Sequence, residues 1–173
     1  MRKLILILLS LLLLVPAVSA QGQEEPGQII VNSQDWRDVY SAMLYGSLTN
    51  RPVSFLVSDR HSGLILNSIP SSSHLWIINS PTPYVTGFAG FAEGKGYTVE
   101  NFDFDSSNFE FADEFETESF ILVDDAYGYN AIAVAPYAVA SRSYVIFADR
   151  DNIDEVSDLL AQKNAATPVS TFL

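Results

Sequence analysis

The chain has 173 residues, of which 48% are hydrophobic and 12% aromatic, and it carries 9 Lys and Arg against 21 Asp and Glu. This composition excludes a disordered tail, because it can bury enough apolar surface to form one compact core. The formal net charge of -12 disfavours binding to nucleic acid or to anionic lipid. Because the chain has no cysteine, it has no disulfide, thiolate nucleophile or cysteine zinc site.

Residues 1–20 have the pattern of a secretory signal peptide. Arg2 and Lys3 precede an apolar run over residues 4–15, and small residues lead to Ala20. The apolar run is shorter than the roughly 20 residues that span a bilayer. We expect cleavage before Gln21, which would leave 7 basic against 21 acidic residues and a net charge of -14. An uncleaved anchor helix is the alternative. Residues 21–27 are expected to form a flexible leader, and the mature protein to be secreted and to lie outside the cytoplasm at the cell surface.

Short apolar segments rich in β-branched and aromatic residues recur along the rest of the chain. Several of them are continuously apolar, which is typical of strands covered on both faces, and the gaps between them suit crossover helices better than hairpins. A mostly parallel sheet of about six strands is therefore expected. The expected strands are residues 28–31, 53–57, 74–78, 97–102, 119–123 and 144–148.

The clearest helices are expected between these strands, over residues 36–48, 129–140 and 152–162. Ser33 and Asp35 are candidates to cap the first helix. Right-handed crossovers would then give an α/β fold, a three-layer Rossmann-like sandwich, over residues 28–162. Residues 163–173 are expected to be a C-terminal tail.

The chain shows an internal pseudo-repeat at an offset of about 92 residues. A strand, a helix with small residues around a Tyr, and a second strand ending in Asp-Arg occur over residues 30–60 and again over 122–150. The two units would cover approximately residues 28–118 and 119–162. The repeat has two interpretations: duplicated packing, because small residues let elements approach closely, or a duplicated ligand site.

The sequence resembles the type-two cell-wall-binding repeat of bacterial and archaeal surface proteins. The segments that carry the resemblance are DVYSAMLYGSLTNRPVSFLVSD from Asp38, NAIAVAPYAVASRSYVIFAD from Asn130, LWIINS from Leu75, YTVENFDF from Tyr97 and NFEFADEF from Asn108. The family's double glycine is replaced by Asn79-Ser80, its Arg by Asn108 and the second repeat's Asp by Asn130.

The resemblance implies a prokaryotic, non-catalytic module of the cell envelope with a Rossmann-like fold. Its implied partner is a cell-envelope polymer or a surface-layer protein. The family's ligands are anionic, so the acidic charge of this chain would oppose binding unless a cation bridged the two.

The sequence carries no recognisable catalytic constellation. His61 and His74 lack zinc-type spacing, and no serine lies in a Gly-x-Ser-x-Gly elbow. Residues 87–94 are glycine-rich but contain Phe where a phosphate loop exposes backbone amides, so they are expected to form a packed helix or loop. The protein is therefore expected not to be an enzyme and to need no cofactor, with calcium as the one candidate.

Polar residues follow the expected strands at their carboxyl ends, where ligands bind in open parallel sheets. This position makes them candidates for a ligand or cation site, and calcium prefers such oxygen ligands. The candidates are Asn32, Asp59, Asn79, Asp124, Asp125 and Asp149. The alternative is that they only cap helices and form turns.

Residues 100–125 carry ten carboxylates interleaved with Phe, and they are expected to form a strand and an amphipathic helix with solvated acids, or a surface for cations or a basic partner. Two further functions are compatible with the sequence: a secreted domain that binds a small ligand or divalent cation, and, as a third choice, a metal-dependent hydrolase.

Overall fold

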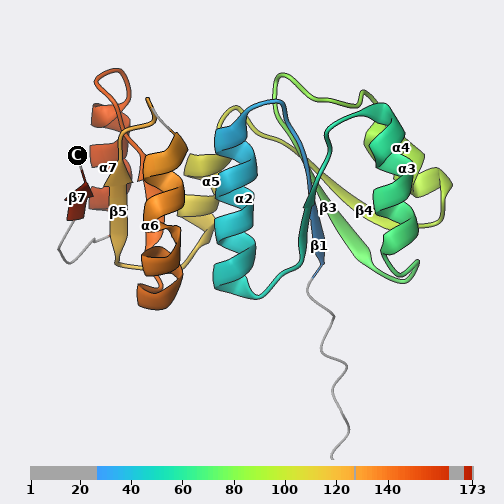
Figure 1. The fold of residues 1–173 in the computed structure, drawn as a ribbon, viewed down its shortest axis with the longest axis horizontal. Helices are drawn as coiled ribbons and strands as arrows, with labels where there is room; N and C mark the ends of the chain where they lie inside the picture. The colour runs from blue at the N-terminus through green and yellow to red at the C-terminus, as the bar shows by residue number, and fades with distance from the viewer. Residues whose placement is uncertain (1–26, 127, 164–169, 173) are drawn as a thin grey trace, which may run out of the picture.

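A computed structural model describes residues 27–126, 128–163 and 170–172 of the chain (Figure 1). The predicted signal peptide and its cleavage site lie outside the described residues. Strands and helices alternate along the chain: β1 (Gln28–Asn32), α2 (Trp36–Thr49), β2 (Val53–Phe55), α3 (Asp59–Ser68), β3 (His74–Asn79), α4 (Phe88–Gly94), β4 (Thr98–Asp103), α5 (Ser107–Glu114), β5 (Phe120–Val123), α6 (Gly128–Ser141), β6 (Tyr144–Phe147), α7 (Ile153–Gln162) and β7 (Ser170–Phe172).

The strands form two parallel sheets. The first has the order β2-β1-β3-β4, and the second has the order β6-β5-β7. The α/β class and the parallel pairing predicted from the sequence are therefore confirmed. The expectation of one sheet of about six strands is wrong, because the main sheet has four strands.

The strands divide into two sheets because β4, the last strand of the first sheet, is not joined by β5. Strand β4 is the edge of the first sheet, and Glu100, Asn101 and Asp103 on that strand are exposed. Charged and polar side chains are typical of an edge that accepts no further strand. Helix α5 follows and packs against α2 and β6, so the chain enters β5 on the far side of a helical layer (Figure 1).

Helices cover both faces of the first sheet, so this sheet is the middle one of three layers, whereas the expected sandwich had one sheet over all of residues 28–162. Ile29 and Val31 of β1 belong to the core that contains α2 and α5, whereas Ile30 packs into a second core under α3 and α4. All three side chains have no exposed surface, which explains why this strand reads as a continuous apolar run.

The two sheets share the first of these cores. The ring of Tyr45 on α2 stacks on Phe111 of α5 with centroids 4.6 Å apart. The Tyr40 hydroxyl donates a hydrogen bond of 2.9 Å to the Ala131 carbonyl of α6. Burial raises the pKa of Tyr40 to about 12, so this hydroxyl keeps its proton at neutral pH.

The β-α-β units that begin each sheet have matching geometry. Helices α2 and α6 each have 14 residues, and their first residues are 92 positions apart. Ile29 pairs with Val53 and Ile121 with Val145, in both cases 24 residues along the chain. Because parallel α/β folds are generally built from such units, the internal repeat stays a prediction.

The sequence located most elements within a few residues. The three expected helices are present, and Asp35 caps α2 by accepting a hydrogen bond from the Arg37 amide. Residues 87–94 contain helix α4. Helix α3 was not specified, and the expected tail contains β7. Among the described residues, no helix combines the length and the apolar character needed to cross a bilayer.

Candidate functional site

A cleft of about 340 Å³ lies where loops from both sheets meet. Residues that follow β1, β3, β4, β5 and β6 contribute to it, so it lies at the carboxyl ends of parallel strands, the usual ligand position in open α/β sheets. The lining residues are Asp35, Arg37, Asp38, Ser80, Pro81, Thr82, Asp105, Ser106, Asn108, Phe109, Asp125, Phe147 and Asn152.

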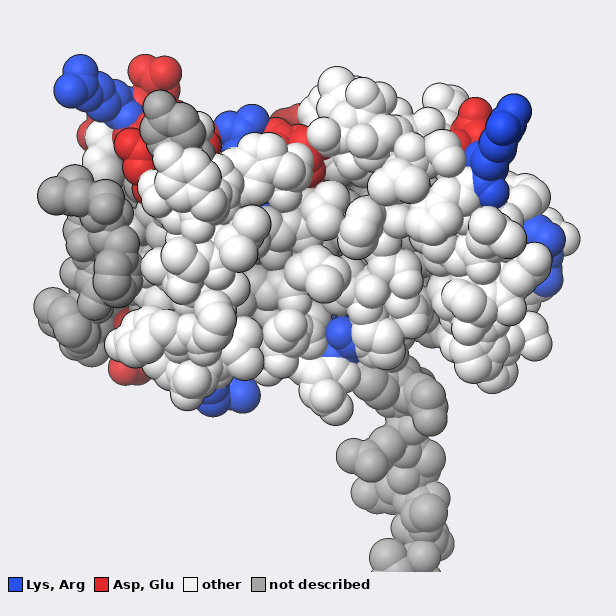
Figure 2. All heavy atoms as spheres, in the orientation of Figure 1, with Lys and Arg blue, Asp and Glu red and all other residues white. Residues whose placement is uncertain are grey.

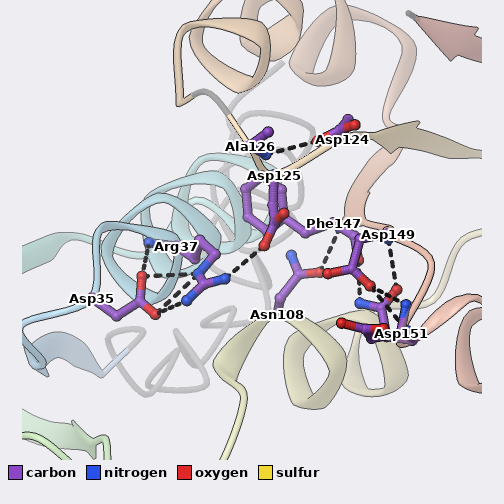
Figure 3. A network of polar contacts seen from close by, with 10 residues as sticks. Asp35, Arg37, Asn108, Asp124, Asp125, Ala126, Phe147, Asp149 and Asp151 are labelled. Carbon is purple, nitrogen blue, oxygen red and sulfur yellow. Dashed lines mark hydrogen bonds and ion pairs between the residues drawn. The ribbon is translucent and has the colours of Figure 1, made fainter.

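Arg37 joins the two sheets across this cleft (Figure 3). Its Nη2 lies 2.6 Å from Oδ2 of Asp35, which precedes α2, and its Nη1 lies 2.6 Å from Oδ2 of Asp125, which follows β5. Nε of Arg37 also donates to both carboxylate oxygens of Asp35, at 3.1 and 3.0 Å. The guanidinium therefore stands between carboxylates from two halves of the chain.

These contacts favour the ionised forms of both Asp35 and Arg37. Partial burial acts to raise the pKa of Asp35, but hydrogen bonds from the Arg37 side chain and backbone, together with its positive charge, hold that pKa below its ordinary value. The hydrogen bond to Asp35 raises the pKa of Arg37, and Asp125 adds to the effect. Asp35 and Arg37 are therefore both ionised throughout the physiological pH range.

Buried polar groups support the cleft from below. Asp38 is 8% exposed, and its carboxylate accepts a 2.6 Å hydrogen bond from the Ser33 hydroxyl and one of 3.2 Å from the Ser107 amide. The first contact links the end of β1 to α2, and the second links α2 to the first turn of α5. Asp38 thus holds three elements of the cleft in place.

Asn108 links α5 to the second sheet. Its side chain donates to the Val145 carbonyl at 2.9 Å and to the Ser41 hydroxyl at 3.0 Å, and its Oδ1 accepts from the Phe147 amide at 3.0 Å. The side chain is only 4% exposed, so these hydrogen bonds are formed away from water. Asn108 therefore fixes the relative position of the two sheets beneath the cleft.

Two of the predicted site residues, Asn32 and Asn79, lie side by side, but their side chains form a hydrogen bond with each other. Asn32 donates to Oδ1 of Asn79 at 2.8 Å and bonds both the amide and the carbonyl of Val85. Asn79 in turn donates to Asn101 and Asp103. Because Asn32 is 1% exposed and both of its polar atoms are engaged, it fastens the loop before α4 to the sheet.

The predicted aspartates do not converge. Asp125 lies in the cleft, whereas the Asp124 carboxylate accepts from the Ala126 amide at 2.7 Å (Figure 3). The Asp149 carboxylate accepts from the amides of Asp151 and Asn152 in an exposed turn. Asp59 is the exposed first residue of α3. Asp124 and Asp149 thus form hydrogen bonds within turns, and their role in a ligand or cation site stays a prediction.

Arg37, Asp38 and Asn108 were not among the predicted site residues. The position of Asp38 in the first turn of a helix after a Ser is a local signal of a structural acid. Arg37 and Asn108 gave no such signal, because their partners Asp125 and Val145 lie 88 and 37 residues away in the chain.

The cleft combines acidic, basic, neutral polar and aromatic side chains. It carries four carboxylates, one guanidinium, neutral hydroxyl and amide groups, and the rings of Phe109 and Phe147. Neither histidine lines it: His74 begins β3, at the opposite end of the strands, with Nε2 3.7 Å from a Glu100 oxygen. Within the ranges that the structure describes, no three His, Asp or Glu residues are placed to hold a metal ion.

Comparison with known proteins finds no matching family model, no matching curated protein and no matching solved structure.

Proposed function

We propose that this chain is a non-catalytic binding module of the prokaryotic cell envelope, secreted through its N-terminal signal peptide. The observation that carries the proposal is the cleft at the carboxyl ends of the strands, where both sheets contribute hydrogen-bonding side chains around Arg37. The resemblance to cell-wall-binding repeats and the signal-peptide pattern supply the location, and the internal repeat is part of the same proposal.

The charges of the cleft select the ligand. Four carboxylates face one guanidinium, so an anionic ligand would meet net negative charge both in the cleft and on the whole chain. Carboxylate and amide groups accept hydrogen bonds from hydroxyls, and Phe109 and Phe147 offer apolar surface to a sugar ring. We therefore favour a neutral, hydroxyl-rich envelope polymer, with an envelope protein as the second partner.

The second candidate is a domain that binds a divalent cation, with calcium first. Asp35, Asp38, Asp105 and Asp125 all line the cleft and carry the hard oxygen atoms that calcium prefers, so the carboxylates would have to move together to coordinate the ion, since no three of them are placed to hold it in the described structure. Arg37 already forms ion pairs with Asp35 and Asp125, which favours the polymer over the cation as the ligand.

The test uses the exported chain and purified envelope polysaccharide from the source cells, with and without calcium. Mass spectrometry of the exported chain should show a first residue of Gln21. Parent protein should be retained on the polysaccharide, and Arg37→Gln should lower retention at least tenfold, because the cleft loses its central donor. Arg60→Gln serves as the matched control, since it removes the same charge from an exposed position on α3 outside the cleft.

Three results would overturn the proposal. Full-length protein in the cytoplasm contradicts the envelope location. Equal retention of parent and Arg37→Gln contradicts the cleft as the site. Retention that appears only with calcium, together with a rise in Tm on adding calcium alone, supports the cation-binding function instead.

A further inference from the structure

Helix α6 exposes apolar side chains on the side turned away from its own sheet. No charged residue occurs from Gly128 to Ser141. Ala131, Val134 and Ala138 are buried against the core, while Ile132 is 69%, Tyr137 56% and Val139 41% exposed. A helix that is apolar all round is normally covered on all sides. The outer face of α6 therefore has the composition of a contact surface.

Helix α2, which matches α6 in the first sheet, shows how such a face packs when another helix covers it. Ser41 and Tyr45 of α2 are buried beneath α5, where Tyr45 stacks on Phe111 and Ser41 accepts a hydrogen bond from Asn108. The residues 92 positions later, Ala133 and Tyr137, are exposed. In the part of the chain that the structure describes, no helix covers α6 as α5 covers α2.

We propose that a second copy of this chain covers the outer face of α6, with α6 packed against α6 about a two-fold axis. Closed two-fold dimers are the commonest soluble assembly, and they bring the same surface of both subunits together. The proposal does not involve the cleft, so it stands independently of the ligand.

The absence of charged residues on α6 is compatible with this occupant. The formal net charge of -12 makes two copies repel each other over most approaches, but an approach through α6 brings no charged helix residues together. Figure 2 shows the Lys, Arg, Asp and Glu side chains of this face mainly around its margin. A lipid surface is less suitable, because helices that lie on membranes usually carry several Lys or Arg, and α6 carries none.

The available area suits a weak dimer. Trp36 of α2, which is 41% exposed, lies against Gly128 at the start of α6 and extends the face. With the exposed residues of α6 it presents on the order of 500 Å² of mostly apolar surface. Two such faces together fall near the lower limit for specific protein interfaces, so dissociation in the micromolar range is expected.

Sedimentation velocity of the purified chain tests the proposal. The parent should change from monomer to dimer as its concentration is raised from low micromolar to near millimolar. Ile132→Glu combined with Tyr137→Glu should weaken dimerisation at least tenfold, because it places like charges opposite each other. The control is Leu64→Glu, since Leu64 is 67% exposed on α3 and should not contribute to the dimer. All variants keep the same termini, so association through those segments is common to all of them.

Circular dichroism checks that each variant is folded, and Ala133→Lys, on the same exposed face, replaces the double variant if that one unfolds. A parent that stays monomeric at the highest concentration overturns the proposal, as does a folded α6 variant that dimerises like the parent. Equal weakening by Leu64→Glu also overturns it. If the monomer already protects residues 128–141 from a surface-labelling reagent, a segment of the same chain covers α6 instead.

Discussion

Arg37 shows how one residue can matter for a site while contributing little to stability. Its side chain is 46% exposed, and exposed ion pairs stabilise folded proteins by roughly 0 to 1 kcal/mol. Its two carboxylate partners come from loops of different sheets. The contact therefore acts mainly by setting the distance between these loops. That distance determines the shape of the cleft in which a ligand would bind.

The pKa of Asp35 gives a prediction on acid stability. Because this pKa lies below its ordinary value of 3.8, the ionised carboxylate stabilises the fold above that pH, and the contribution is lost as pH falls below 3.8 and through the lowered value. Asp35→Asn keeps the helix cap but removes the charge. Its Tm should be lower than that of the parent by up to a few degrees at pH 7, and the difference should close in strong acid.

The control for this experiment is Asp158→Asn, because removing any acid lowers the repulsion in a chain with net charge -12. That variant should melt at or slightly above the parent temperature. A difference between Asp35→Asn and the parent that persists unchanged from pH 7 to pH 2 would show that the ion pair is not its cause.

Individual residues could be predicted only where their roles were local. Asp35 was identified as a cap because its partner, the Arg37 amide, is two residues away. Asn32 and Asn79 were correctly placed at strand ends, but nothing local shows that each uses its amide to bind the other. The Arg37–Asp125 pair depends on the arrangement of two sheets, which the sequence pattern did not specify.

Helix α2 shows why small residues recur in this chain. Gly46 lies so close to β2 that an added Cβ would be 2.2 Å from Cγ2 of Val53 and 2.8 Å from the Arg51 carbonyl oxygen. No side chain fits there without movement of the strand. This close contact agrees with the expectation that the small residues of the helix serve packing.

Gly46→Ala should therefore destabilise the protein by about 1 to 3 kcal/mol, although alanine is the better helix former. Urea unfolding followed by circular dichroism measures the change. Gly63→Ala is the matched control: it lies inside α3 with nothing within 4 Å of the added Cβ, and it should stabilise by up to about 1 kcal/mol. Equal effects of the two substitutions would contradict the close approach of α2 and β2.

The elements were more predictable than the residues, because their signals lie within short windows. Candidate cap residues located α2, a high alanine content located α6, and apolar residues on one face located α7, while continuous apolar runs located β1, β3 and β6. Helix α3 was not predicted, since it has only ten residues and its internal Gly63 lowers the helix propensity of the segment. Strand β7 was missed because three residues carry too little pattern to be distinguished from a tail.

At the scale of the whole molecule, α2 and α5 connect the sheets into one unit. Phe111 is 3% exposed and contacts both Tyr45 and Phe104, so it lies in the core that the sheets share. The expectation of a single six-stranded sheet was wrong at this scale. Strand order depends on contacts between distant segments, and the apolar runs are equally consistent with one sheet or with two.

Phe111→Ala should lower the free energy of unfolding by roughly 3 to 5 kcal/mol, since it leaves a cavity in the shared core. Hydrogen exchange at equilibrium should show the amides of β1 and β5 losing protection together. Phe91→Ala, at an exposed position on α4, should change little. Faster exchange in β5 with unchanged exchange in β1 would show that the sheets unfold separately.

The pairing of β7 with β5 also has a consequence during synthesis. Strand β5 is complete once Val123 is made, and β6 then occupies one of its edges. Its other edge, with unpaired backbone amides and carbonyls, stays open until residues 170–172 leave the ribosome. Open strand edges promote pairing with other chains. A chain in which β5 and β6 have paired is therefore most exposed to aggregation until β7 pairs with the open edge of β5.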